Sequence, residues 1–288
     1  MKQLLHYVSI CLLATLFFSA CEKVNLEEDG QTATDEANLI LRLVTPKPTF
    51  SAQGTLEKNN STPSELINIA KVCSRIDCAL FKGNKKMKRI TQTTTEKHFG
   101  QLAMSVSEGT YTVVIIAHNG EGAATISSPQ KIKFPHNKVT DTYSFCGEVT
   151  VEEKTEKTLT LLQTVAVVSL HITEKLPVEA TQIELKYTGG SSTLDAKNGV
   201  GCVKSRQTET REITDKMHTS PSQIKIYTFP RTDQSALMVT ATVLNKADHI
   251  MTTKEFTDIE VQTGKTSILT SRLFPDFIDA DAPPFTLL

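Results

Sequence analysis

The side chain with the clearest chemical setting is the thiol of Cys21. It follows two small residues, the second of them Ala20, at the end of an apolar run that starts near Val8. Lys2 places a positive charge before that run, which is shorter than the roughly 20 residues of a membrane-spanning helix and suits a signal peptide. A cysteine in this setting is the lipid acceptor of the bacterial lipoprotein signal. We therefore predict a signal peptide over residues 1–20, cleavage between Ala20 and Cys21, and lipidation of Cys21.

Acylation of Cys21 would anchor the chain without any membrane-spanning helix. Stable anchoring needs more than one acyl chain, because each buried methylene contributes roughly 0.8 kcal/mol. A diacylated or triacylated cysteine meets that requirement, whereas the alternative is an ordinary secretory signal followed by a chance cysteine. Residues 21–37 are polar, with acidic side chains at Glu27, Glu28 and Asp29. We predict that they form a flexible tether, either as a simple spacer or as a surface-export signal.

No motif for catalysis follows the signal sequence. The GxSxG, HExxH, phosphate-loop and GxGxxG patterns are all missing, and no two histidines lie at metal-ligand spacing. His118 follows an apolar segment within the turn sequence of residues 117–120, so we interpret it as a structural residue. We expect no catalytic residue, metal, cofactor or small-molecule substrate, and the alternative is a site assembled from residues distant in sequence.

Four further cysteines follow Cys21, namely Cys73, Cys78, Cys146 and Cys202. Export permits disulfide bonds, and four cysteines allow three pairings. A bridge between Cys73 and Cys78 is one alternative, because they are close in sequence. Buried free thiols are the other, which we favour because a chain of this length does not depend on disulfides for its core.

The overall composition is that of a β-rich protein without a nucleic-acid partner. Basic and acidic residues nearly balance, 31 against 32, so no positive surplus attracts nucleic acid. Tryptophan is absent and aromatic residues are 6%, which argues against a site that stacks sugars on aromatic rings. Threonine is abundant and valine, isoleucine and leucine recur in short runs, as is typical of strands.

The first half of the chain predicts strands with one short helix. Residues 38–44 alternate, with Leu39, Leu41 and Leu43 on one face of a first strand. A capping box with proline at the first helical position predicts a helix over residues 63–72. A glycine–asparagine turn at residues 83–84 then predicts a hairpin.

The spacing of the strands predicts an all-β fold of two β-sandwich domains in series. We place the first domain at residues 38–156, with a polar joint at its end, and the second at residues 157–288, with a short tail from residue 275. Residues 159–172 are the longest apolar stretch after the signal sequence, and we expect a strand, a kink and another strand there. The tail is apolar in part, but Pro283 and Pro284 prevent one continuous strand, so it could donate a strand or dock to a partner, or fold back.

Several stretches in combination resemble the fimbrillin-associated anchor lipoproteins, which belong to the transthyretin-like pilus system of Gram-negative anaerobes. The stretches are residues 107–119, 145–151, 160–172, 187–195 and 201–214. The resemblance covers most of residues 38–275. It rests on the order and combination of these stretches, because any one of them alone would be a weak match.

The resemblance implies two transthyretin-like β-sandwich domains with Greek-key connections and no enzymatic activity. It implies an anchor or accessory subunit that supports fimbria attachment and length control from the outer membrane, at the cell surface. The implied partner is the major fimbrial subunit, bound by strand addition. In that system the removal of an N-terminal strand opens a hydrophobic groove, which a neighbour's strand fills.

One departure from the stalk subunits of this system concerns the first strand. Those subunits carry an arginine in the leader that a trypsin-like protease cuts, whereas residues 22–41 contain none. The first arginine is Arg42, a candidate protease site inside the predicted strand. We hypothesise that the strand carrying Leu39, Leu41 and Leu43 is retained, so that the groove stays filled and the subunit ends the polymer.

Three other functions compete with that of an anchor. The main alternative is a surface lipoprotein that uses the same β-sandwich domains as a binding module, for adhesion or for glycans. A tip adhesin would need a larger terminal ligand domain, for which 288 residues leave little room. A hydrolase is the most distant alternative, because no catalytic motif supports it.

Overall fold

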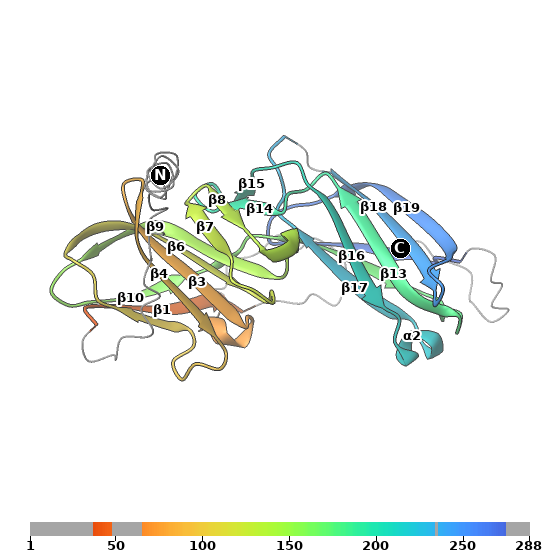
Figure 1. Cartoon of the computed structure of the whole chain (residues 1–288), viewed down its shortest axis with the longest axis horizontal. Helices are drawn as coiled ribbons and strands as arrows, with labels where there is room; N and C mark the ends of the chain where they lie inside the picture. Colours follow the sequence, from red (N-terminus) through yellow and green to blue (C-terminus); the bar gives the residue numbers. More distant parts are fainter. Residues whose placement is uncertain (1–36, 48–64, 234–235, 275–288) are drawn as a thin grey trace, which may run out of the picture. The chain divides into compact units, whose positions relative to one another are not determined.

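The computed structural model describes residues 37–47, 65–233 and 236–274, and within them the chain folds almost entirely as β-strands (Figure 1). The predicted all-β class is therefore confirmed. None of the helices in these residues is long and apolar enough to cross a membrane. The signal sequence, Cys21 and most of the predicted tether lie outside the described residues.

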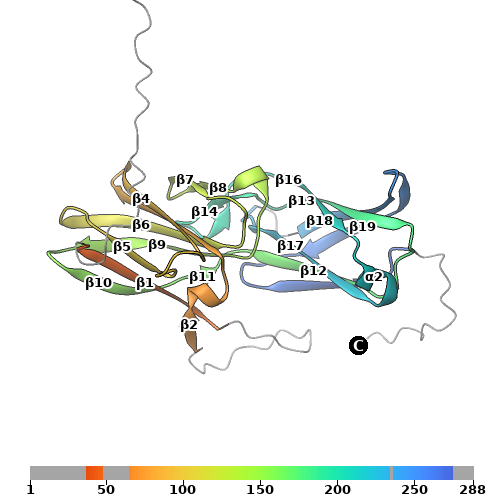
Figure 2. The same ribbon diagram turned by 60° about the horizontal axis from the view of Figure 1, so that its bottom comes forward.

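The first sandwich consists of two sheets that enclose one apolar core (Figure 2). In the smaller sheet, β1 (Leu39–Pro46) lies between β10 (Thr155–Thr160) on one side and two short strands on the other. The two short strands are β2 (Leu66–Asn68) and β5 (Gln101–Met104). The larger sheet has the order β11 (Leu162–Gln163), β9 (Thr142–Val151), β6 (Gly109–His118), β3 (Arg75–Lys82) and β4 (Lys85–Thr93).

The second sandwich repeats this arrangement. Its smaller sheet has the order β17 (Ser222–Thr228), β12 (Ala166–Ile172) and β20 (Thr266–Ser271). Its larger sheet has the order β16 (Arg206–Glu212), β13 (Ala180–Thr188), β18 (Ala236–Asn245) and β19 (Ile250–Glu260). The central pairings correspond: β1 pairs in parallel with β10, as β12 does with β20, and β3 lies between β4 and β6, as β13 does between β16 and β18. The short strands β2 and β11 of the first sandwich have no counterpart in the described part of the second.

Two insertions join the sandwiches through a third, small sheet. The insertion after β6 forms β7 (Thr125–Ser128) and β8 (Lys131–Lys133), and the insertion after β13 forms β14 (Thr193–Asp195) and β15 (Val200–Gly201). β14 pairs with β8, which makes one bridging sheet of the order β15-β14-β8-β7. The bridging sheet belongs to both halves of the chain.

The central strands of the first sandwich are buried on both faces. In β6, Val113 and Ile115 face the core of the sandwich, whereas Val114 and Ile116 face a separate apolar cluster beneath the bridging sheet. Such two-sided burial requires apolar residues at consecutive positions, and this explains the unbroken apolar run of the sequence there. The second cluster also contains Phe229 from the second half, so burial as well as strand pairing joins the two halves.

Gly189 ends β13 in a conformation that favours glycine. Its φ is +100°, and a Cβ atom there would collide with the carbonyl oxygen of Ala236 in the neighbouring strand. At Gly190 a Cβ atom would collide with the side chain of Thr228. The glycine pair therefore lets the chain leave β13 in close contact with its neighbours on the way to the bridging sheet.

The predicted helix over residues 63–72 is wrong where the structure describes it. Residues 66–68 are β2, which pairs with the end of β1, and Ile69–Lys71 form a single turn of 3₁₀ helix. The Asn68 side chain accepts a hydrogen bond of 2.8 Å from the Ala70 N–H and starts this turn. Pairing with β1 uses the backbone groups that a helix would need, so tertiary contact overrides the local helix signal. The α-helix within the described residues is α2 (Asp215–Thr219), in the second half.

Replacing Phe229 by alanine should destabilise the protein. The side chain is fully buried and its ring packs against Phe134, with 5.4 Å between the ring centroids. A truncation of this kind costs about 3–5 kcal/mol, because it removes apolar contacts and leaves a cavity. Urea denaturation followed by circular dichroism measures the effect. Ile268→Ala is the control, because that side chain is 50% exposed. An equal loss of unfolding free energy in both variants would contradict the described cluster.

Candidate functional site

β1 is the element whose position bears most directly on function, because it is an interior strand of its sheet. Residues 39–44 pair in parallel with residues 155–160 of β10. On the opposite edge, Leu39–Arg42 pair with β5 and Val44–Pro46 pair with β2, both antiparallel. The backbone of β1 is thus hydrogen-bonded along both edges, and neither edge is open to another strand.

The inward face of β1 fills the core of the first sandwich. Leu39, Leu41 and Leu43 are at most 1% exposed and belong to one cluster with buried residues of β3, β5 and β6. The structure therefore brings the three predicted leucines together in one core, on one face of the strand. Full burial of a leucine contributes roughly 1.5–3 kcal/mol, so the strand is held by its side chains as well as by its backbone.

A side-chain clip fixes the start of β1. Asn38 donates a hydrogen bond to the carbonyl oxygen of Val106 (2.8 Å) and accepts one from the Val106 N–H (2.9 Å). Both partners of the asparagine amide are backbone atoms 68 residues away in sequence. Reasoning from the sequence missed this role, because nothing local to Asn38 indicates which carbonyl and N–H it meets.

Arg42 lies on the outward face of β1. Its side chain is 51% exposed and forms an ion pair of 3.1 Å with Glu156 of β10. The backbone around it is paired on both sides, since Arg42 is in register with Thr158 on one edge and Gln101 on the other. The guanidinium group is therefore accessible, whereas the adjacent peptide bond is held inside the sheet.

His118 belongs to a buried polar network with Asp77. Both side chains are fully buried, and His118 Nε2 lies 3.1 Å from Asp77 Oδ2. The Gly120 N–H donates to His118 Nδ1, so Nε2 carries the ring proton and donates to the carboxylate. Asp77 also accepts from the Ala124 N–H and the Thr91 hydroxyl, each at 2.8 Å.

This network fastens a loop to the sheet beneath it. Asp77 and His118 lie in the paired strands β3 and β6, and Ala124 lies in the segment that leads to the bridging sheet. Both ring nitrogens of His118 are occupied by protein groups, and its ring lies edge-on to Phe134. The arrangement positions the loop and leaves no ring nitrogen directed at a substrate.

The four described cysteines are all free thiols. Cys73 and Cys78 are buried, Cys146 is half-buried and Cys202 is exposed. Burial raises the pKa of Cys73 to about 12 and raises that of Cys78 well above its usual range. In the described part of the chain, no group of three or more histidine, cysteine or acidic side chains is arranged to hold a metal ion.

The architecture defines a class of all-β proteins with two β-sandwiches in series. A candidate adhesin from Bacteroides ovatus ATCC 8483 has the same fold, with a TM-score of 0.50 at 12% sequence identity, covering 86% of this chain and 94% of that one. A model of the fimbrillin-A associated anchor proteins Mfa1 and Mfa2 matches residues 58–272, and the chain belongs to this family. It is therefore a fimbria-associated protein of the cell envelope.

Two further solved structures are similar. The fimbrial anchor protein Mfa2 from Porphyromonas gingivalis aligns with a TM-score of 0.36 at 10% identity, covering 75% of this chain and 80% of that one. A candidate polysaccharide-binding protein from Bacteroides thetaiotaomicron aligns with a TM-score of 0.45 at 9% identity, covering 76% and 80%. None of the curated proteins matches this chain in sequence.

The Arg42–Leu43 bond should resist trypsin in the native protein. Trypsin can cut this bond only when the segment has left the sheet. When this opening is fast, the cleavage rate follows the population of the opened protein. Leu41→Ala should cost about 2–5 kcal/mol and raise cleavage at this bond at least about tenfold. Mass spectrometry detects the product that starts at Leu43, which Arg42→Gln in the same background should abolish. Rapid cleavage of the native, unsubstituted chain at this bond would contradict the described pairing.

Alkylation of the native protein at pH 8 should modify Cys202 first, then Cys146, with Cys73 and Cys78 protected. The thiolate is the reactive form, and a pKa raised by burial lowers its fraction at a given pH. Burial also raises the pKa of Cys146 and Cys202, so exposure decides the order between these two. Peptide mass spectrometry after iodoacetamide treatment gives the order, and all four should react equally in urea. Early labelling of Cys78 would be inconsistent with its burial.

Proposed function

We propose that this protein is a fimbrial anchor or accessory subunit, tethered to the outer membrane by a lipid on Cys21 and displayed at the cell surface. Membership of the anchor-protein family supports a fimbrial role, and the setting of Cys21 supports the lipid. The observation that carries the proposal is the interior position of β1, with its backbone paired on both edges and three leucines in the core. The proposed role is structural, without a catalytic step.

The mechanism rests on strand addition with the major fimbrial subunit. A strand that joins a sheet gains main-chain hydrogen bonds along an open edge, and its alternate side chains fill pockets left by a missing strand. In this protein β1 occupies that place. A subunit that keeps β1 has no open groove to receive a neighbour's strand, so assembly ends at this subunit and the fimbrium remains attached through it.

Retention of β1 follows from the cost of its release. Extraction would expose three leucines, at roughly 1.5–3 kcal/mol each, and would break the ladders to β10, β5 and β2. Residues 22–41 offer no arginine to a protease that cuts after arginine, and Arg42 lies within the ladder. The membrane end of the chain therefore stays continuous with the fold.

Deletion of the gene, followed by electron microscopy of cells and of the culture supernatant, tests the anchor function. Fimbriae should be detached or abnormally long, because nothing ends the polymer at the membrane. Cys21→Ala should give the same phenotype, since it removes the lipid while leaving the sandwiches intact. Normal, attached fimbriae in both strains would sink the anchor function and favour a surface binding module, for adhesion or for glycans.

N-terminal sequencing of the protein from assembled fimbriae tests the retained strand separately. The mature chain should begin at the acylated Cys21. A start at Leu43 would show that Leu39–Arg42 of β1 had been removed, and the proposed reason for the end of assembly would then be wrong.

A further inference from the structure

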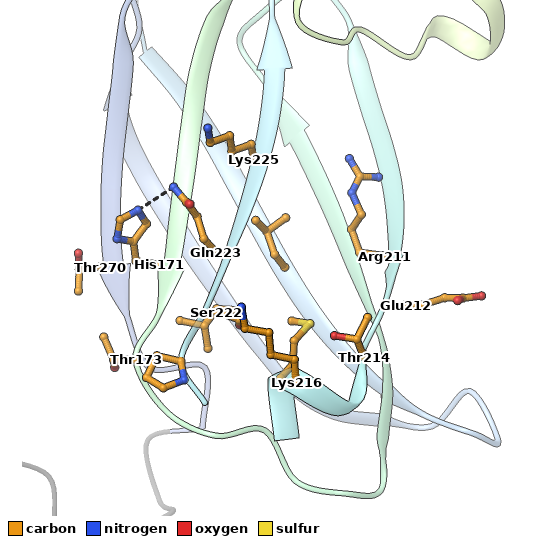
Figure 3. Close-up of a pocket in the computed structure, with 14 residues that line it drawn as sticks. His171, Thr173, Arg211, Glu212, Thr214, Lys216, Ser222, Gln223, Lys225 and Thr270 are labelled. Carbon is orange, nitrogen blue, oxygen red and sulfur yellow. Dashed lines mark hydrogen bonds between the residues drawn. The ribbon is translucent and has the colours of Figure 1, made fainter. Parts of the chain in front are cut away.

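A cavity of about 770 Å³ opens at one end of the second sandwich (Figure 3). It is lined by the end of β12, the start of β17, the end of β16, α2 and part of β20. β17 is an edge strand of its sheet, so the cavity lies where the sandwich is open at its side. Nothing in the proposed anchor function uses this cavity.

The lining combines an apolar floor with positive charge. Ile172, Ile224 and Met217 are buried and form the floor. Lys216 supplies positive charge, as do Arg211, which is ion-paired with Glu209, and Lys225, which alternates with Ile224 and lies on the outer face of β17 at the rim of the cavity. Glu212 is the acidic residue of the lining, and Figure 3 shows its side chain directed away from the other labelled residues. The cavity is thus suited to a ligand with both apolar and anionic groups.

The chain leaves the described fold beside this cavity. Ile172 pairs with Ser271 of β20, and Thr270 of the same strand lines the cavity, so β20 ends next to it. The N–H groups of Leu273 and Phe274 then bind Glu174 Oε1, at 2.6 and 3.1 Å. Residues 275–288, the tail, continue from this point and, when extended, would span up to roughly 46 Å.

The composition of the tail complements the cavity. Its charged residues are Asp276, Asp279 and Asp281, with no lysine or arginine. Phe277 and Ile278 lie among these aspartates, and the two prolines at 283–284 follow. The first half of the tail therefore offers the apolar and anionic groups that the floor and the positive charge would bind.

We propose that residues 276–282 of the tail fold back into this cavity, with the aspartates near Lys216 and Lys225 and the apolar pair against the floor. We favour docking of the tail from the same chain over docking of the tail of a second copy. The short linker gives the tethered tail an effective concentration at the cavity in the millimolar range. Whether the tail folds back or binds a partner lies outside the described residues. While the tail is docked, neither it nor the cavity is available to another protein.

Zero-length carbodiimide cross-linking of the full chain tests the contact, because it joins carboxylates to lysines that touch. Mass spectrometry of an equal mixture of ¹⁵N-labelled and unlabelled protein separates contacts within one chain from contacts between chains. Tail aspartates should couple to Lys216 or Lys225 within one chain. The yield should fall in 1 M salt, where the screening length is about 3 Å. The proposal would be overturned if the tail aspartates formed cross-links only between chains. It would also be overturned if their cross-links to Lys216 and Lys225 were no more abundant than those to Lys154 and Lys157 in the first sandwich.

Hydrogen–deuterium exchange with matched variants gives a second readout. Changing Asp276, Asp279 and Asp281 to asparagine should speed exchange several-fold in peptides that cover residues 215–225. The control changes Glu27, Glu28 and Asp29 to the corresponding amides, which alters the net charge equally and should leave these peptides unchanged. Equal exchange in the tail variant and the unsubstituted protein would overturn the docking, and would leave the anchor function untouched.

Discussion

The parallel pairing of β1 with β10 is the interaction on which the first sandwich depends. Arg42 and Glu156 meet across it from positions 114 residues apart, so the ladder closes a loop of chain that contains almost the whole domain. Because the two strands come from the two ends of the domain, their pairing closes a long loop and costs more chain entropy than a local hairpin does. If β1 left, β10 and β5 would each have an unpaired inner edge, and the core would lose three leucines.

The second sandwich has the same arrangement but a different exposure to proteolysis. β12 lies between β17 and β20, as β1 lies between β5 and β10. β12, however, is continuous with the first sandwich on one side and with β13 on the other, whereas only the N-terminal segment precedes β1. A single cut after β1 would separate β1 from the rest of the first sandwich, whereas β12 would need a cut on each side.

Much of the fold follows from local pattern, and the rest follows from contacts between distant segments. The Gly83–Asn84 turn predicts the β3–β4 hairpin correctly, and the apolar run of β6 indicates a strand buried on both faces. Residues 66–72 mislead because Leu66–Asn68 pair with a strand about 20 residues earlier, which no local signal reports. The Asn38 clip, the Asp77–His118 network and the bridging sheet escape prediction for the same reason. In each case a polar or short segment has its partner far away in sequence.

The bridging sheet also bears on how an anchor carries tension. In the proposed anchor, force from the lipid enters the fold at β1, whose six registered pairs with β10 share the load along the strand direction. Such a ladder resists as a unit, because no pair can slip without displacing the others and the buried leucines. The second sandwich is joined to the first by the β8–β14 pairing and by the cluster that contains Phe229, as well as by the chain itself. The pairing and the cluster share Ile132 and Leu194, so they form one interface that holds the two sandwiches together under load in addition to the covalent linker.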